Sequence, residues 1–387
     1  MLNRSLLGAI ALVAAAGVAS PAAAQELSLN EIAVHGYGAW SYGRTTDNAN
    51  TNMFLFGHQR GDYSHVEFAL NLAAQLNDRL QIVAQPFWHA GHHANQTASG
   101  VDYGFGEWKF SDALRFRIGA VKQPFGIYTE IFDVNTLRPF GALPQGVYGP
   151  SGMVGKAYTG MGFTGVRFAD NGWGVGYDIY GGGLEVAERD AALQVIAQGP
   201  DTLGKTLNLA ETRTFRDVIG GRVIGHTPID GLTFGVSAYM GSRPVNGVER
   251  HREVLGAHAE FLNDVWSIRT EFARETDDVN RRTIDGAYAE AAYRLTRSIQ
   301  VAGLWTMQRS NMTGANMSYA SSLAHHDEYA AALNYWFTPN LGVKTSFHYV
   351  EGNRFASPEP QNIRRFVATG RLSDITRVVL VGGALSF

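Results

Sequence analysis

The sequence lacks cysteine, and after its first residues it also lacks long apolar runs. None of its 387 residues is a cysteine, which excludes a disulfide framework. Beyond the amino-terminal segment no stretch stays apolar for about eighteen residues, which excludes a protein built from membrane-spanning helices. Neither sign of charge dominates, with 32 basic and 35 acidic side chains. Nucleic-acid binding is therefore not expected, because a basic surface provides that affinity.

The amino-terminal segment has the pattern of a secretory signal peptide. Arg4 precedes an apolar run at 6–18, and a small-residue cleavage site follows at 22–24. The apolar run is shorter than the roughly twenty residues that a spanning helix needs. We predict a signal peptide at 1–24 and an exported mature chain at 25–387.

Glycine and aromatic residues are abundant, whereas charged residues are few. The chain holds 45 glycines and 11% aromatic residues, with only 17% charged residues. This composition is typical of close-packed strands whose ends carry aromatic side chains. A strand of a membrane barrel needs only about nine to eleven alternating residues, so such a barrel remains permitted.

Residues 375–387 alternate apolar side chains with small or polar ones. Successive side chains of a strand point to opposite faces, so Val379 and Leu385 share one face. We expect a closing strand that pairs with a first strand at 32–42 and removes both edges of the sheet. The terminal aromatic residue, Phe387, also resembles the signal by which outer-membrane barrels are recognised for insertion.

Seven short stretches of turn-forming residues separate the alternating segments. Asparagine, aspartate, glycine and proline favour the tight or left-handed backbone that a hairpin needs. Each turn joins two strands, and the first and closing strands bring the count to roughly sixteen, an even number as in bacterial barrels. The predicted turns lie at 77–78, 111–112, 170–172, 228–231, 263–264, 296–298 and 339–340.

The segments beside these turns carry their charges on one face only. At 114–120, for example, apolar side chains alternate with Arg115 and Arg117. A charge at the lipid midplane would cost about 2–4 kcal/mol, so the charged face is expected to line a wet lumen. A soluble sandwich or propeller has the same alternation, but it does not need an aromatic rim. The expected rim comprises Phe110, Phe168, Trp173, Phe261, Trp266, Trp336, Phe337 and Phe387.

One long segment, 122–157, cannot be a strand. It contains four prolines, and proline removes the donors that a sheet needs. A barrel of about sixteen strands is wide enough to leave an aqueous channel. This segment is therefore the candidate that narrows the channel.

At this position the chain resembles bacterial trimeric porins, whose long third extracellular loop folds into the barrel and forms the constriction. Residues 122–126 look like a lysine-x-proline-phenylalanine motif of the porin family that includes phosphate-selective porins, although the dense lysine cluster of those members is absent. The resemblance implies an all-β transmembrane barrel that passes small hydrophilic solutes by passive diffusion. It also implies a homotrimer in the outer membrane of a Gram-negative bacterium, in contact with lipid such as lipopolysaccharide.

Charged residues on this segment and on the facing wall are the predicted selectivity site. Arginines opposite acidic groups would create a transverse field that selects solutes by charge. The alternative interpretation is that these charges only hold the segment against the wall by ion pairs. The predicted constriction residues are Arg115, Arg117, Lys122, Glu130, Asp133, Arg138 and Lys156.

Further charged residues are predicted to face the lumen along the strands. They are of both signs, so they do not define a selectivity, and a substrate-selective anion or carboxylate channel remains the alternative function. These candidates are Arg167, Arg222, Arg269, Glu271, Glu290, Arg294 and Lys344.

Two histidine groups and one large loop complete the candidates. His89, His92 and His93, and likewise 325–328, carry metal-ligand chemistry, but we interpret them as solvated loop residues and predict no metal or other cofactor. A large extracellular loop is predicted at 183–214, with an amphipathic helix at 184–198. An outer-membrane lipase or protease is the rival class, but no short motif brings serine, histidine and an acid together, so we predict no enzyme.

Overall fold

The computed structural model describes residues 32–45, 50–52, 61–90, 98–149, 153–188, 211–245, 247–278, 281–312, 321–358, 369 and 374–387. The predicted signal peptide lies outside these residues. No helix in this part of the chain is long and apolar enough to cross a membrane.

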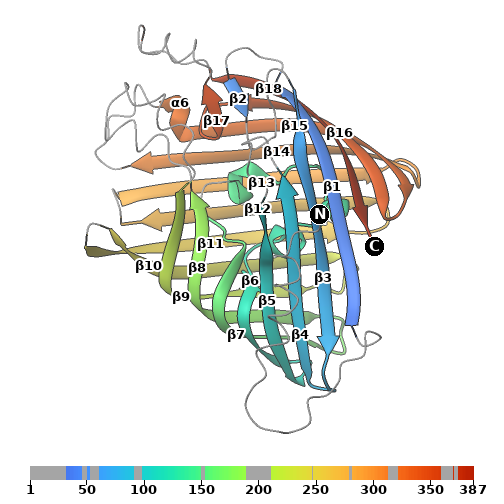
Figure 1. The fold of residues 1–387 in the computed structure, drawn as a ribbon, viewed down its shortest axis with the longest axis vertical. Helices are drawn as coiled ribbons and strands as arrows, with labels where there is room; N and C mark the ends of the chain where they lie inside the picture. The colour runs from blue at the N-terminus through green and yellow to red at the C-terminus, as the bar shows by residue number, and fades with distance from the viewer. Residues whose placement is uncertain are drawn as a thin grey trace, which may run out of the picture.

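The described strands form a closed antiparallel barrel of sixteen (Figure 1). Each strand pairs with its sequence neighbours, and the last one pairs with the first. In chain order the barrel strands are β1 (Ile32–Thr45), β3 (Asp62–Gln75), β4 (Leu80–Ala90), β5 (Ala98–Ser111), β6 (Leu114–Lys122), β7 (Ala157–Phe168), β8 (Gly174–Glu188), β9 (Glu211–His226), β10 (Leu232–Val245), β11 (Val248–Leu262), β12 (Trp266–Asp277), β13 (Arg282–Arg294), β14 (Ile299–Met312), β15 (His325–Thr338), β16 (Leu341–Glu351) and β18 (Ile375–Ser386). A separate small ribbon joins β2 (Asn50–Asn52) to β17 (Ala356–Pro358), and a short helix α6 (Ser321–Ala324) precedes β15.

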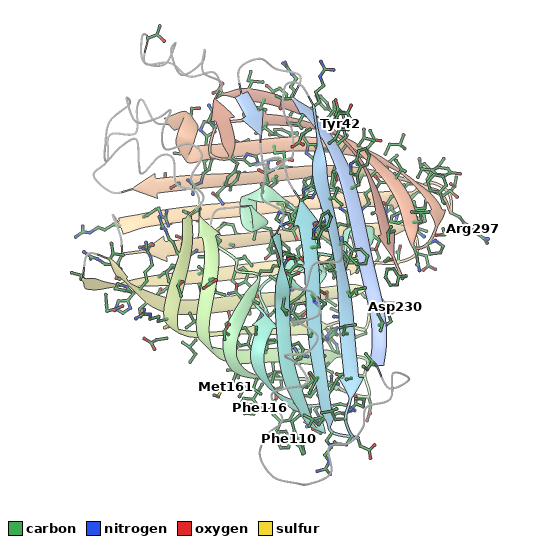
Figure 2. The ribbon with its side chains drawn as sticks, in the orientation of Figure 1. Tyr42, Phe110, Phe116, Met161, Asp230 and Arg297 are labelled. Atoms are coloured by element: carbon green, nitrogen blue, oxygen red, sulfur yellow. The ribbon has the colours of Figure 1, made fainter. Side chains whose placement is uncertain are left out.

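The seven predicted turns are confirmed, because each joins two neighbouring strands of the barrel. Asn263 shows why such residues are needed: its side-chain oxygen accepts hydrogen bonds from the backbone N–H groups of Val265 and Trp266. Gly172 and Gly231 adopt positive φ angles of 83° and 79°. The turn residues Asp230 and Arg297 are labelled at the right of Figure 2.

The closing strand is also confirmed. β18 pairs with β1 from Tyr37↔Ser386 to Thr45↔Val378. Beyond it, the backbones of Gly36 and Phe387 exchange two hydrogen bonds of 2.9 Å. The last residue therefore takes part in closure, and the barrel strands leave no open edge.

The two faces of the wall differ as the alternation predicts. Large apolar side chains such as Met161 (Figure 2), Val236 and Leu333 lie on the outer face, where each is 55% exposed or more. Charged and polar side chains such as Glu271 and Arg269 are buried on the other face, which in a closed barrel is the inner one. Between β6 and β7 lies a segment that crosses this inner face and contains α2 (Tyr128–Ile131), the 3₁₀ turn η2 (Asn135–Leu137) and α3 (Gln145–Tyr148).

Two predictions about the faces of the wall are wrong. Trp336 is only 8% exposed and lies on the inner face with Asn334, not in the outer aromatic rim. Arg167 pairs with Val175, which is 54% exposed, so the register places Arg167 on the outer face rather than in the lumen. Near a strand end an arginine reaches water from either face, so charge alone does not assign the face there.

The large loop is shorter than predicted. β8 extends to Glu188 and β9 begins at Glu211, so 184–188 form strand instead of the start of a helix. Leu184 and Val186 are both 1% exposed while Glu185 between them is exposed, which is the alternation of a strand. The remainder, 189–210, lies outside the described residues.

A charge on the outer face tests whether that face contacts lipid. We expect Leu333→Arg to destabilise the refolded barrel by about 2–4 kcal/mol relative to Leu333→Ala, because Leu333 lies well inside β15. Urea unfolding in lipid vesicles measures this difference. The control Asp264→Arg, in an exposed turn, should have little effect, and an equally small effect at Leu333 would contradict a lipid-facing wall.

Candidate functional site

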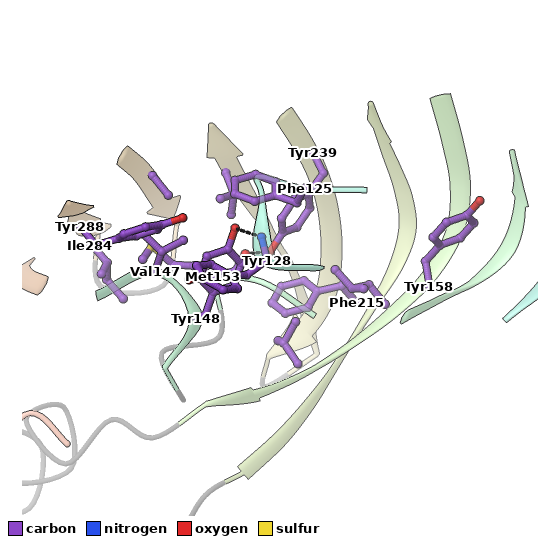
Figure 3. Close-up of a cluster of buried hydrophobic side chains, with 14 of the residues drawn as sticks. Phe125, Tyr128, Val147, Tyr148, Met153, Tyr158, Phe215, Tyr239, Ile284 and Tyr288 are labelled. Atoms are coloured by element: carbon purple, nitrogen blue, oxygen red, sulfur yellow. Dashed lines mark hydrogen bonds between the residues drawn. The ribbon is translucent and has the colours of Figure 1, made fainter. Parts of the chain in front are cut away.

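The segment between β6 and β7 is held by aromatic packing against the inner wall (Figure 3). Phe125, Tyr128 and Tyr148, which belong to the segment, are buried in one hydrophobic cluster with Tyr239 and Tyr288 of the wall. The ring of Tyr128 lies 5.5 Å from that of Tyr148 and 5.9 Å from that of Tyr288. This packing gives the segment a hydrophobic core inside an otherwise polar barrel.

Backbone geometry lets the segment approach the wall closely. Gly126 adopts a positive φ of 60°, and its N–H donates to Ser237 on β10. Gly146 in α3 lies against Gly286 on β13, where an added Cβ at Gly286 would be 2.0 Å from the Gly146 carbonyl oxygen. Glycine is therefore required on both sides of this contact.

Carboxylates on β12 and β13 receive hydrogen bonds from the segment. The Tyr148 hydroxyl donates to Glu271 at 2.6 Å, and the Tyr128 hydroxyl donates to Glu290 at 2.6 Å. Burial and then the adjacent carboxylate raise the pKa of each tyrosine well above its usual value, so both keep the proton that they donate. Arg269 contacts Glu260 at 2.7 Å and Glu290 at 3.4 Å. These wall charges therefore hold the segment and do not line open lumen.

Basic residues on β9 and β16 provide further anchors. Arg222 forms an ion pair with Asp178 at 2.9 Å, bonds to Glu130, and donates to the Gly126 carbonyl at 3.1 Å. Lys344 donates to the carbonyl oxygens of two segment residues, 135 and 138. The segment is thus bound to the β9–β16 side of the barrel.

Arg115 and Arg117 lie on the inner face of β6, but they do not contact the acidic residues of the segment. Arg117 pairs with Glu107 on β5 at 2.7 Å, and Arg115 lies 3.7 Å from Glu107 and 3.6 Å from Asp112 in the turn. Arg294 ends β13, at the short-turn end of the barrel. Glu130, the expected partner across the lumen, is bound by Arg222 instead. The predicted set is therefore divided into separate groups.

Lys122, Asp133 and Lys156 do come together, with Asp102 of β5 as a fourth member. Asp133 lies 3.1 Å from Lys122 and 3.0 Å from Lys156, and Lys156 lies 2.6 Å from Asp102. Burial alone would raise the pKa of Asp133, but the two ammonium groups outweigh it and hold the pKa below its usual value. Burial likewise would lower the pKa of Lys156, but the two carboxylates raise it. Asp133 and Lys156 therefore keep their charges around neutral pH.

A cavity of about 890 Å³ remains between the segment and the β1–β8 side of the wall. Its lining includes Asp133, Arg138 and Lys156 from the segment, and Glu67 and Asp102 from the wall. Neither Arg115 nor Arg117 lines it. Of the predicted selectivity residues, those that line the cavity therefore belong to the segment and not to β6.

Sequence reasoning missed several important residues. Asp102 falls where β4 and β5 change register between Gln85 and Pro86, so simple alternation does not place its side chain. The proline-rich segment has no strand or helix periodicity, so sequence patterns do not single out its residues Tyr128, Gln145 and Tyr148. For the two tyrosines, the only signal is that large aromatic residues are frequent in a stretch that would otherwise be interpreted as an exposed loop.

The histidine groups have different environments. His89 lines the cavity, whereas His92 and His93 lie outside the described residues. His326 and His348 bond to opposite oxygens of Glu328 at 3.0 and 2.6 Å, and all three are buried. In the described part of the chain, no group of three or more histidine and acidic residues is arranged to hold a metal ion.

No family model and no curated protein sequence matches this chain. Solved structures do match it. The outer-membrane channel DcaP of Acinetobacter baumannii superimposes with a TM-score of 0.58 at 6% identity, over 92% of this chain and 97% of that one. The fold is that of an outer-membrane porin.

Two further structures agree over 92% of this chain. The anion-selective porin from Comamonas acidovorans gives a TM-score of 0.56 at 10% identity and is covered over 99% of its length. OmpF of Salmonella typhi gives 0.56 at 12% identity, over 97% of that chain. At such low identities the likeness shows the porin fold, while the likeness of 122–126 to phosphate-selective porins stays a prediction.

A methyl group at the contact between Gly146 and Gly286 tests how the segment is held. We expect Gly286→Ala to reduce the free energy of unfolding by about 1–3 kcal/mol, because the new Cβ collides with backbone that cannot move aside easily. Denaturant unfolding in detergent measures the change. The matched control is Gly303→Ala on neighbouring β14, where no atom lies within 4 Å of the new Cβ. Equal stabilities of the two variants would contradict this docking.

The depressed pKa of Asp133 predicts how its removal depends on pH. Its charge stabilises the fold above the unfolded pKa of 3.8, and this stabilisation is lost only as pH falls through the lower folded value. In a channel, Asp133→Asn should leave Lys122 and Lys156 less compensated and shift the reversal potential toward anions. The shift should be the same at about pH 5 and about pH 8. A shift that disappears at the lower pH would show that Asp133 is protonated there.

Proposed function

We propose that this protein is an outer-membrane porin through which small hydrophilic solutes pass by diffusion. The observation that carries the proposal is a closed sixteen-stranded barrel with a polar inner face, in which the docked segment leaves a cavity of about 890 Å³. Barrels of about sixteen strands are wide enough to hold water, and an apolar outer face suits lipid. No enzymatic step is needed for this activity.

The segment 123–156 is the proposed constriction. Because it is bound to β9–β16, it blocks that side of the barrel and leaves the passage beside β1 and β3–β8. Charge selection is assigned to Asp133, Arg138 and Lys156, which line this passage, and to Lys122, which pairs with Asp133. Arg115 and Arg117 form a separate cationic group nearer the short turns. An anion or carboxylate channel is the alternative within this class.

Cellular location and assembly follow from the same proposal. A signal peptide at 1–24 and the porin fold support export to the outer membrane of a Gram-negative bacterium. The structural neighbours are outer-membrane proteins, and the chain has the apolar outer face that lipid, including lipopolysaccharide, would contact. A homotrimer is proposed by analogy with trimeric porins.

One observation favours an enzyme as a second candidate. The Ser346 hydroxyl lies 2.7 Å from Nε2 of His348, whose Nδ1 lies 2.6 Å from Glu328. This is the order of groups in a serine hydrolase. However, Ser346 is buried and the adjoining cavity is only about 10 Å³, too small for an ester substrate. Hydrolysis is therefore the weaker candidate.

Electrical recording from the refolded protein separates the two candidates. We expect stable single-channel currents in KCl after insertion into planar bilayers, because the docked segment leaves an open cavity beside the β1–β8 side of the wall. Ser346→Ala should keep the current, since the hydroxyl does not line the main cavity. Turnover of ester probes that Ser346→Ala abolishes, in a protein that passes no current, would overturn the porin proposal.

A further inference from the structure

Arg138 is buried in the passage without an acidic partner. Its side chain is 6% exposed, lines the main cavity and forms no ion pair in the described part of the chain. Its Nε has no hydrogen-bond partner there either. A buried guanidinium is normally paired with a carboxylate, so this one lacks the anion that its position calls for.

Gln145 lines the same cavity and is also unsatisfied. Its side chain is 3% exposed, and neither the amide nitrogen nor the amide oxygen has a hydrogen-bond partner among the described residues. An amide that can both donate and accept at the wall of a cavity suits a polar solute group. Arg138 and Gln145 both belong to the docked segment, so they present these groups from one side.

Glu67 supplies an opposite charge from the wall. It lies on β3 and lines the same cavity, where the imidazole of His65 lies 4.0 Å from its carboxylate. No ion pair joins Glu67 to Arg138 in the described part of the chain. A gap therefore separates a cation on the segment from an anion on the wall.

The other charges of the cavity do not fill this gap. Lys156 is already paired with Asp102 and Asp133. Over the whole lining, acidic residues outnumber basic ones, with Glu67, Asp102, Asp133 and Glu185 against Arg138 and Lys156. A solute with only a negative charge would pair with Arg138 but would be repelled by the more numerous acidic residues. A solute with only a positive charge would leave Arg138 unpaired. Only a solute with both charges satisfies both sides.

We propose that the passage holds a binding site for zwitterionic solutes of the α-amino acid class, with the carboxylate on Arg138 and Gln145 and the ammonium on Glu67. Apolar surface from Phe87, Phe132 and Val154 in the same cavity accepts an aliphatic or aromatic side chain. This inference rests on the proposed channel function and adds the solute class to it.

Three matched probes test the assignment: valine, N-acetylvaline, which keeps only the negative charge, and valinamide, which keeps only the positive charge. Each is titrated against the KCl current of single channels, and the concentration that halves the current is measured. Valine should block at concentrations about tenfold lower than either derivative, because each derivative loses one charge-assisted contact.

Neutral variants should give a crossed pattern. Arg138→Gln should weaken block by valine and N-acetylvaline about tenfold and spare valinamide, and Glu67→Gln should weaken valine and valinamide and spare N-acetylvaline. The control Arg274→Gln removes an arginine that pairs with Asp285 and does not line the cavity. It should change none of the three.

The two proposals fail in distinguishable ways. Absence of any KCl current would refute the channel, and calorimetric titration of the refolded protein with valine would then still test the site. A normal current that valine does not reduce would refute the site alone. Equal block by valine and N-acetylvaline would replace the zwitterion site by a plain anion site.

Discussion

Charges inside a barrel must be neutralised, and the docking of one proline-rich segment against the inner wall meets this requirement. The wall of β9–β16 presents Arg222, Arg269, Glu271 and Glu290 to the interior, where each is buried. Without the segment these groups would need water or one another. With it, tyrosine hydroxyls donate to both glutamates and the Gly126 carbonyl accepts from Arg222, while aromatic rings fill the space between. The ions and the segment therefore depend on each other.

Much of the fold could be predicted from the sequence because its signals are local. Strand periodicity, turn residues such as those at 263–264, and the alternation at 375–387 each depend on a few neighbouring residues. Closure adds no further unknown, since the last strand has only the first one left to pair with. This is why the number of strands and all seven turns are recovered in the structure.

The candidate site was less predictable because its contacts join residues far apart in the chain. Tyr128 meets Glu290, and Glu130 meets Arg222 rather than Arg117. Such pairings depend on how a segment without a period folds, and a strand pattern carries no information about that. Local irregularity adds to the difficulty, because Asp102, which pairs with Lys156, lies at a register shift opposite Gln85 and Pro86. At strand ends, as at Arg167, a charged side chain can reach water from either face, so the free-energy cost of a charge in lipid does not decide which face it occupies.

The eccentric position of the segment gives the barrel two kinds of inner wall. Inward residues of β9–β16 are enclosed as in the core of a soluble protein, with Glu275 and His326 each 0% exposed. Inward residues of β3–β5 border the cavity instead. Tolerance to substitution should therefore vary with the angle around the barrel axis more than with depth along it. A sequence could change the width of its passage on one side while the other side conserves the packing that keeps the molecule folded.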